Sequence, residues 1–328
     1  MGHRFLSDLT DRESVNEVYL ASQKILRPNR NGQLYLQVQL ADRSGSLSAL
    51  MWNAGENVYQ SFAEGEYVRV QGTAQLYQGE MQMIATKIEP VPATAVNPTD
   101  FTVQTPDQID KLVLRLEQIL RGLADEHLRA LAECYLMDET FMRAFSHVPA
   151  GVKNHHAYVG GLLNHVVRLL EVALRVCELY PKLKKDLLLL GVFLHDSGKV
   201  QELSYEKGFA YTDEGQLIGH VVLGVGMLER KAAEAERLLG EAVPEDLLLQ
   251  LRHMIVSHHG SHEFGAPRLP MTLEAVALWQ IDNLDAKLQS FEQLMKDDPN
   301  TDSPWTLFHA NIGRKLYKGL PPGAAAAE

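Results

Sequence analysis

The chain has 328 residues, 45% of them hydrophobic, and a formal net charge of −11, which is enough length for two domains with substantial cores. The acidic balance argues against a broad basic face for nucleic acid, although a narrow groove or bound divalent cations are compatible with it. No stretch approaches the roughly 18 unbroken apolar residues of a membrane span, and the first residues lack a signal-peptide pattern, so we expect a cytoplasmic protein without a membrane partner.

The first part of the chain has the pattern of short β-strands. Within residues 16–89, apolar and polar residues alternate from Leu34 to Leu40, and "DRSG" then predicts a turn into the next strand. Further turn signals stand at Gly72 and at Gln78–Gly79. Short antiparallel strands joined in this way predict a small barrel over residues 1–90, and the OB-fold is the best-known barrel of this size that binds oligonucleotides.

Aromatic and basic side chains of this barrel are candidates for contacting a nucleic acid strand. Aromatic rings stack on bases, and guanidinium groups contact phosphates. The candidates are Tyr35, Trp52, Tyr77, Arg27, Arg30, Arg43 and Arg69. For each aromatic residue, the alternative is a place in the barrel core.

The composition and the period of the sequence change after the barrel. Residues 91–106 are rich in Pro and Thr, which predicts a linker. Apolar residues then recur at helical spacing, so we expect residues 107–320 to form an all-α domain. Residues 321–328, "PPGAAAAE", predict a disordered tail.

The start of the helical domain carries a clear signal. Thr105 is a capping residue and Pro106 suits the first helical position. Cys134 and Cys177 lie in helical segments without paired spacing, which predicts reduced thiols and neither a disulfide nor a zinc site.

Five segments of the helical domain place histidine or aspartate next to apolar residues. Imidazole and carboxylate groups without thiolates are good ligands for Mn, Fe, Co or Zn, and a cation removes the cost of burying them. The candidates are His165, His195, Asp196, His220, His258, His259 and Asp282. For any single histidine a hydrogen-bonded core position is the more common explanation, and only the complete set favours a metal site.

The order of these residues resembles the HD-domain superfamily of metal-dependent phosphohydrolases, which has an all-helical fold. More specifically, "NHHAYVGGLLNH", "LHDSGKVQEL", "YTDEGQLIGH", "SHHGSHEFGAP" and "DNLDAK", preceded by a barrel, resemble the YhaM-type 3′-to-5′ exoribonucleases over almost the whole chain. Two-metal HD proteins that cleave cyclic dinucleotides carry His-His-Glu and then Gly-Tyr-Pro after the paired histidines. Both elements are missing from "HHGSHEFGAP", which argues against that substrate.

The resemblance implies two divalent metal ions, with Mn as the first choice and Fe, Co or Zn as alternatives. The first would be held by His165, His195, Asp196 and Asp282. The second would share Asp196 and would be held by His220, His258 and His259. Lys199 is a candidate for holding a phosphate oxygen or stabilising the leaving group, an ordinary surface lysine being the alternative. Candidates for supporting the ligands or contacting substrate are His155, His156 and His262.

We therefore expect a metal-dependent exonuclease that hydrolyses single-stranded RNA, with DNA as a further candidate substrate, to nucleoside 5′-monophosphates. In this interpretation Asp196 and Lys199 are the catalytic residues, and the 3′-to-5′ polarity comes from the resemblance alone. Two alternatives stay open. The chain could be an HD phosphohydrolase acting on free nucleotides, or a catalytically silent single-strand-binding protein. A homo-oligomer is also left open.

Overall fold

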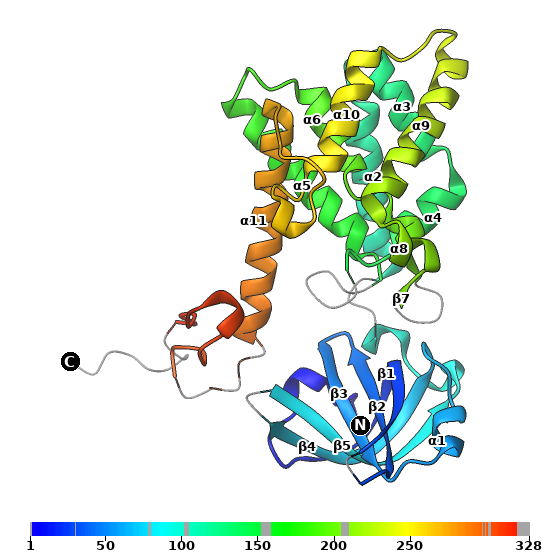
Figure 1. Ribbon diagram of the computed structural model, residues 1–328, viewed down its shortest axis with the longest axis vertical. Coiled ribbons are helices and arrows are strands. Elements are labelled where there is room, and N and C mark those ends of the chain that lie inside the picture. The colour runs from blue at the N-terminus through cyan, green and yellow to red at the C-terminus, as the bar shows by residue number, and fades with distance from the viewer. Residues whose placement is uncertain are drawn as a thin grey trace, which may run out of the picture. The chain divides into compact units, whose positions relative to one another are not determined.

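The computed structural model describes residues 2–29, 31–77, 80–101, 105–151, 159–204, 210–296, 298, 300 and 303–319 (Figure 1). These residues divide into two compact units. The barrel unit contains the described residues of 2–101 and 289–319, and the helical unit contains those of 105–288. This division groups the end of the chain with the barrel, whereas the sequence predicted that end as part of the helical domain. The predicted domain bounds stay a prediction. The predicted tail at 321–328 lies outside the described residues.

Five strands of the barrel unit close into a barrel in the order β1-β2-β3-β5-β4. Their bounds are β1 Ser14–Pro28, β2 Leu34–Asp42, β3 Gly45–Trp52, β4 Tyr67–Tyr77 and β5 Glu80–Val91. The alternation in β2 buries Leu36, Val38 and Leu40 completely, while Leu34 at the strand end stays exposed. The strand β3 pairs antiparallel with β2 and parallel with β5, and helix α1 (Glu56–Gln60) connects β3 to β4. The predicted small closed barrel is confirmed.

Gly72 lies inside β4, so the turn that the sequence predicted there was wrong. The register between β4 and β5 shifts at Gln71 and Gly72, which marks a β-bulge. A Cβ at Gly72 would collide with the carbonyl oxygen of Ile84. Glycine is required here because two strands approach closely, and the chain does not turn. The other turn signal, Gln78–Gly79, lies outside the described residues.

Part of the segment predicted as a linker packs on the barrel. The backbone N–H of Arg43 donates to the carbonyl of Asp100 at 2.9 Å. The ring of Phe101 lies 4.7 Å from that of Tyr67 and 5.2 Å from that of His3, measured between centroids. The short helical turns η2 (Ala93–Ala95) and η3 (Pro98–Asp100) lead up to this contact.

The helical unit is built from ten α-helices among the described residues. Their bounds are α2 Pro106–Arg121, α3 Glu126–Leu136, α4 Glu139–His147, α5 Gly161–Leu179, α6 Lys185–Leu194, α7 Lys199–Glu202, α8 Asp213–Leu217, α9 His220–Leu239, α10 Glu245–Ser257 and α11 Leu273–Lys296. Thr105 and Gln108 form the expected capping box at the start of α2, with Pro106 in the first position. Two short strands, β6 (Leu203–Ser204) and β7 (Ala210–Tyr211), pair antiparallel and add a small sheet to the described part of the predicted all-α domain.

Helix α6 is the centre of the helical unit. Every residue from Leu187 to Leu194 is buried, because α3, α5 and α10 pack around it. A helix that is apolar all round has to be enclosed in this way. Gly191 lets α10 approach closely, since a Cβ there would collide with the side chain of Met254. The end of α6 is thereby a rigid support for the residues that follow it.

Helix α11 has one buried face and one exposed face. Ala275, Leu278 and Ile281 pack into the core of the helical unit, whereas Leu284 and Leu288 are exposed.

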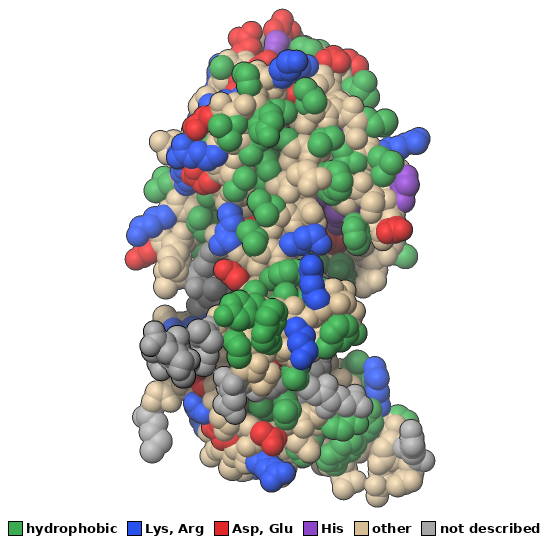
Figure 2. All heavy atoms as spheres, turned by 90° about the vertical axis from the view of Figure 1, so that its left-hand side faces the viewer, with side chains coloured by type: hydrophobic (Ala, Val, Ile, Leu, Met, Phe, Trp, Pro, Cys, Tyr) green, Lys and Arg blue, Asp and Glu red, His purple; other side chains and the backbone are tan. Residues whose placement is uncertain are grey.

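On the molecular face drawn in Figure 2, apolar side chains reach the surface and are interspersed with acidic and basic ones. Within the described ranges, no helix combines the length and the apolar character that crossing a bilayer requires. Both cysteines are free thiols.

The turn after α6 touches the start of α9. A Cβ at Gly198 would collide with the carbonyl oxygen of His220 and would lie 2.7 Å from the backbone nitrogen of Gly224. Both obstacles are backbone atoms, so they cannot move aside as a flexible side chain can. Gly198 therefore sets the distance between the turn that carries Asp196 and the helix that carries His220.

We expect Gly198→Ala to destabilise the helical unit, since overpacking of this kind costs about 1–3 kcal/mol. Gly226→Ala in α9 is the matched control: its Cβ would meet only the Arg230 Nη1 atom at 3.6 Å. That control should gain up to about 1 kcal/mol of helix propensity. Thermal unfolding followed by circular dichroism measures both. Equal midpoints for the two variants would contradict the backbone contact.

Candidate metal centre

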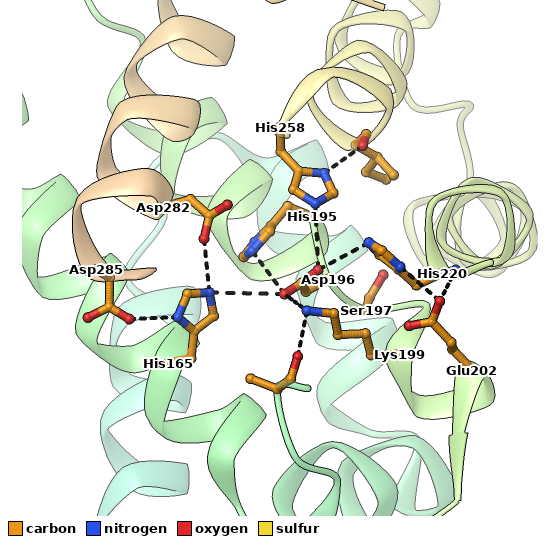
Figure 3. A network of polar contacts seen from close by, with 12 residues as sticks. His165, His195, Asp196, Ser197, Lys199, Glu202, His220, His258, Asp282 and Asp285 are labelled. Atoms are coloured by element: carbon orange, nitrogen blue, oxygen red, sulfur yellow. Dashed lines mark hydrogen bonds and ion pairs between the residues drawn. The ribbon is translucent and has the colours of Figure 1, made fainter. Parts of the chain in front are cut away.

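Asp196 lies at the centre of a buried polar network (Figure 3). It follows His195, the residue that ends α6, and is only 3% exposed. Its Oδ2 atom lies 2.6 Å from Lys199 Nζ and 3.3 Å from His195 Nε2. Its Oδ1 atom lies 3.5 Å from His220 Nε2 and 3.6 Å from His258 Nε2. The two carboxylate oxygens therefore face two different groups of imidazoles.

The first group is the cluster of His165, His195 and Asp282, whose candidate ligand atoms lie within 4.8 Å of one another. His165 stands on the second turn of α5, and its Nε2 atom lies 3.3 Å from Asp282 Oδ1 and 4.0 Å from Asp196 Oδ2. Asp282 belongs to α11. Three helices that are distant in sequence thus bring their polar groups to one point.

The second group is the cluster of His220, His258 and His259, again with ligand atoms within 4.8 Å of one another. His220 is the first residue of α9, and its ring centroid lies 5.2 Å from that of His259. Gly260 follows the pair with a φ of +78°, and a Cβ there would collide with the indole of Trp279. The chain can therefore leave the His258–His259 pair only through a glycine.

Two of the histidines are oriented by backbone carbonyls. The Nδ1 atom of His195 donates to the carbonyl of Val192 at 2.7 Å, and that of His258 donates to Ile255 at 2.7 Å. A carbonyl can only accept, so Nδ1 carries the proton in both rings. In the neutral imidazole, Nε2 then keeps its lone pair and points into the centre.

Two carboxylates that the sequence analysis missed orient the other histidines. Glu202 Oε1 lies 3.0 Å from His220 Nδ1. The same oxygen accepts a hydrogen bond from the backbone N–H of His220 at 2.9 Å. Asp285 Oδ2 lies 2.8 Å from His165 Nδ1. The spacing of Asp285, three residues after Asp282 on one helix, was a signal that could have found it. Glu202 offered no comparable signal, because its partner lies across a loop.

The centre concentrates buried polar atoms without hydrogen bonds. Among the described residues, eight buried side-chain nitrogen or oxygen atoms have no hydrogen-bond partner, and five of them belong to Asp196 and the two clusters. These five are His195 Nε2, Asp196 Oδ1, His220 Nε2, His258 Nε2 and His259 Nδ1. Leaving such atoms unsatisfied is unfavourable, and a coordinated cation satisfies them together.

The distances fit metal ligation. When two ligand atoms bind one ion at about 2.1 Å, and the angle between them at the ion is between about 90° and the tetrahedral value, they lie roughly 3.0–3.4 Å apart. The separations here are 3.3 Å from His195 Nε2 to Asp196 Oδ2, 3.3 Å from His165 Nε2 to Asp282 Oδ1, and 3.5 Å from His220 Nε2 to Asp196 Oδ1. The seven residues could hold two divalent ions with only small adjustments.

The carboxylates of the centre are ionised. Burial by itself raises the pKa of Asp196, but Lys199 and His195 outweigh burial and hold this pKa well below its usual value. Burial also raises the pKa of Asp282, and the hydrogen bond with His165 reverses that effect and lowers it. The centre thus contains two negative charges that face imidazole nitrogens.

The imidazoles divide into two kinds. Burial lowers the pKa of His258 well below its usual value and lowers that of His259 as well, so both rings are neutral near pH 7. Burial also lowers the pKa of His165, but its hydrogen bonds with Asp282 and Asp285 outweigh burial and raise this pKa to about 9. His165 therefore holds a proton that a cation has to displace.

Lys199 is not an ordinary surface lysine. Its Nζ atom donates to Asp196 Oδ2 at 2.6 Å and to the carbonyl of Ala150 at 2.7 Å. Burial by itself lowers the pKa of Lys199, and Asp196 outweighs burial and raises it. Lys199 is thus a charged group that lies directly beside the candidate metal ligands.

The other predicted residues of the helical unit are His262, His155 and His156. His262 uses its Nδ1 atom to donate to the carbonyl of Ala266 at 2.8 Å and so closes a loop. His155 and His156 lie outside the described residues. A further group of possible ligands, Glu126 with His127 and Glu241, lies on the surface of the helical unit.

Three of the predicted barrel residues form a row across neighbouring strands. Arg27 on β1 pairs with Tyr35 on β2, which pairs with Trp52 on β3. The ring centroids of Tyr35 and Trp52 are 5.2 Å apart. Trp52 is 49% exposed, so the core position considered for this residue is wrong.

The remaining barrel candidates are not part of this row. Tyr77 ends β4 and is 55% exposed, and Arg69 lies exposed in the middle of the same strand. Arg43 lies in the turn at the other end of the β2–β3 hairpin, with its guanidinium 4.3 Å from the ring centroid of Phe5. Arg30 lies outside the described residues.

Comparison with known proteins agrees with both units. A family model of the OB-fold nucleic acid binding domain matches residues 18–91, and a model of the HD domain matches residues 162–287. The 3′-5′ exoribonuclease YhaM of Bacillus subtilis (strain 168) is 34% identical over 285 residues, which cover 87% of this chain and 88% of that protein. The chain belongs to the YhaM family.

Two further YhaM proteins support this membership. The 3′-5′ exoribonuclease YhaM of Bacillus pumilus (strain SAFR-032) is 36% identical over 81% of this chain and 82% of that protein. The one from Geobacillus sp. (strain WCH70) is 34% identical over 85% of each. The HD match spans all the residues of the candidate centre, from His165 to Asp282. An HD domain implies binding of divalent metal, which agrees with the donor set described above.

Binding of Mn²⁺ to the metal-free protein should release about one proton at pH 7, because His165, with a pKa of about 9, has to lose its proton before Nε2 can bind a cation. Below pH 9 the proton competes with the metal, so the apparent affinity should rise as the pH rises from 6 to 8. Isothermal titration calorimetry in buffers of different ionisation enthalpy measures the release. A His165→Asn variant should lose it, and pH-independent binding by the wild type would contradict the assignment.

Glu202→Ala should weaken Mn²⁺ binding about 10- to 100-fold, since partners that orient a metal-binding histidine typically contribute that much. The reason is that His220 loses the carboxylate at 3.0 Å that fixes its ring. Glu241→Ala is the control, because it removes a carboxylate from the surface group at His127. Loss of binding in the control with full binding in Glu202→Ala would place the metal at the surface group instead.

Proposed function

We propose that this chain is a metal-dependent 3′-to-5′ exonuclease that hydrolyses single-stranded RNA to nucleoside 5′-monophosphates. The observation that carries the proposal is the pair of ligand clusters on opposite oxygens of one buried carboxylate, Asp196. Two-metal sites joined through a shared ligand are suited to phosphodiester hydrolysis. The names of the Bacillus and Geobacillus relatives support the substrate class and the polarity.

In this proposal, one ion is held by His165, His195, Asp196 and Asp282. The other is held by Asp196, His220, His258 and His259. When bound, the ions lower the pKa of a water molecule and neutralise charge on the phosphoryl oxygens. The donor set of nitrogen and oxygen atoms without thiolate suits Mn, Fe, Co or Zn, and we propose Mn as the first choice.

The protein's own residues determine the geometry of this centre. Asp196 sets the spacing of the two ions because each of its oxygens faces one cluster. Glu202 and Asp285 hold the rings of His220 and His165, so that Nε2 of each ring faces inward. Lys199 brings a positive charge next to Asp196, where it can pair with a phosphate oxygen or with the departing 3′ oxygen. Attack by water breaks the bond between the phosphorus and that oxygen, which leaves a 3′ hydroxyl on the shortened strand.

We assign strand binding to the barrel, with the row of Arg27, Tyr35 and Trp52 as the contact surface. OB-folds bind oligonucleotides on the face formed by their second and third strands, and Tyr35 and Trp52 stand on the corresponding strands β2 and β3. An exposed indole beside a tyrosine ring suits stacking on bases, and the neighbouring guanidinium suits a phosphate. Joining a modest strand-binding module to the helical unit raises the local concentration of substrate there.

The activity is tested with the purified full chain, Mn²⁺ and a 5′-labelled single-stranded RNA. A ladder of products that shorten from the 3′ end is the expected result. Phosphate release from mononucleotides alone would support an HD phosphohydrolase of free nucleotides instead. RNA binding without any turnover would support a catalytically silent binding protein. A parallel reaction on single-stranded DNA decides whether DNA is also a substrate.

Asp196→Asn should lower turnover by more than about 100-fold, because even outer partners of metal ligands contribute 10- to 100-fold. The substitution keeps the shape of the side chain and removes the charge that both clusters face. Asp110→Asn on the exposed face of α2 is the matched control. Circular dichroism of each variant checks that the helical content is unchanged. Full activity of Asp196→Asn would remove Asp196 from the centre.

A further inference from the structure

Three strongly exposed apolar side chains stand within five residues of the second imidazole cluster in the sequence. Leu217, at the end of α8, is 85% exposed and stands three residues before His220, and Val222 is 57% exposed and stands two residues after it. Phe264, in the loop between α10 and α11, is 71% exposed. Such side chains are ordinary when they are scattered singly, and Phe264 is set apart by the contact of its loop with the candidate centre.

The loop that carries Phe264 is held by its own hydrogen bonds. The backbone N–H groups of Phe264 and Ala266 both donate to the carbonyl of Ser261 at 3.1 Å, and that of Gly265 donates to His262 at 3.1 Å. The ring of His262 closes the loop by donating to Ala266 at 2.8 Å. Gly265 has a φ of +86°, which favours glycine and completes the turn. The phenyl ring of Phe264 is thus presented to solvent from a fixed backbone.

The same loop lies against the candidate metal centre. A Cβ built on Gly265 would lie 3.8 Å from His259 Nδ1, which is ordinary contact distance. His259 Nδ1 is one of the five buried atoms without a hydrogen-bond partner. The backbone next to Phe264 therefore packs on an imidazole of the second cluster, and the Phe264 side chain one residue away is exposed.

We propose that Phe264 stacks on the base of the 3′-terminal nucleotide and holds that nucleotide for cleavage. The inference rests on the proposed exonuclease function, because an enzyme that releases mononucleotides has to position the last nucleotide. Every base has a face on which an aromatic ring can stack, so this contact accepts all four bases. A paired terminal base is already stacked in its duplex, and the contact therefore selects single-stranded ends.

Phe264→Ala should lower kcat/KM on single-stranded RNA roughly 5- to 100-fold, the range found for loss of one base-stacking contact. Phe264→Trp should keep the activity. Tyr180→Ala is the matched control, since Tyr180 is an exposed aromatic at the far end of α5 from His165. Mn²⁺ binding of Phe264→Ala, measured by calorimetry, should equal that of the wild type, which a distorted centre would not allow.

The deciding comparison uses RNA whose 3′-terminal residue is abasic. On this substrate kcat/KM of the wild type should fall by the factor that Phe264→Ala causes on intact RNA. Phe264→Ala should lower kcat/KM on this substrate no further. RNA with an abasic penultimate residue is the control, and there the effect of Phe264→Ala should be undiminished. If the substitution is equally harmful on the RNA with the terminal abasic residue, or harmless on intact RNA, the stacking proposal is overturned.

A binding measurement separates this proposal from the proposed function. With Mn²⁺ present, Phe264→Ala should weaken the binding of adenosine 5′-monophosphate and leave that of ribose 5-phosphate unchanged. A wild type that shortens no RNA would reject the exonuclease function, and the two binding constants would still decide the role of Phe264. Equal binding of adenosine 5′-monophosphate by the wild type and by Phe264→Ala would overturn the stacking contact even in an active nuclease.

Discussion

The burial of the Asp196 carboxylate is the constraint on which the helical unit depends. An ionised carboxylate loses its water at the end of an apolar helix, and this loss has to be offset by neighbouring positive or hydrogen-bonding groups. Lys199 offsets it from one oxygen, at 2.6 Å. At the other oxygen, burial lowers the pKa of His258 and keeps this ring neutral, so a cation between that oxygen and the imidazoles would complete the compensation. The need to place all these groups around one point explains why five helices end or pass there.

Close contacts at three glycines hold this arrangement together, with backbone atoms at Gly198 and with the side chains of Met254 and Trp279 at the other two. Gly191 brings α10 onto α6, Gly198 brings the Asp196 turn onto α9, and Gly260 brings the His258–His259 pair against α11. Each of these contacts joins two elements that carry ligand residues. The orienting groups come from the same elements, since Glu202 stands on α7 and Asp285 on α11. A histidine whose outer nitrogen is held in this way loses little freedom when its inner nitrogen binds a cation.

The two units solve different parts of the task that we propose. The barrel offers a short row of aromatic and basic groups, which suits weak binding to any single strand. The helical unit offers dense polar chemistry and, at its edge, exposed apolar side chains next to the imidazoles. The net charge of −11 leaves little general attraction for a polyanion, so metal ions and a few placed groups have to provide it locally.

The sequence by itself determined the fold class and most element types, and it singled out the residues that the fold gathers into the candidate metal centre. These depend on residues close in the chain: the alternation in β2, the cap at Thr105, the apolar run of α6 and the motifs around His195 and Asp282. Tertiary structure alone decided which side chains orient the histidines, because Glu202 and His220 meet across a loop and Asp285 and His165 come from different helices. It also decided that Gly72 serves a bulge and that Trp52 faces solvent. These features depend on which segments lie side by side, and local residue patterns do not specify that.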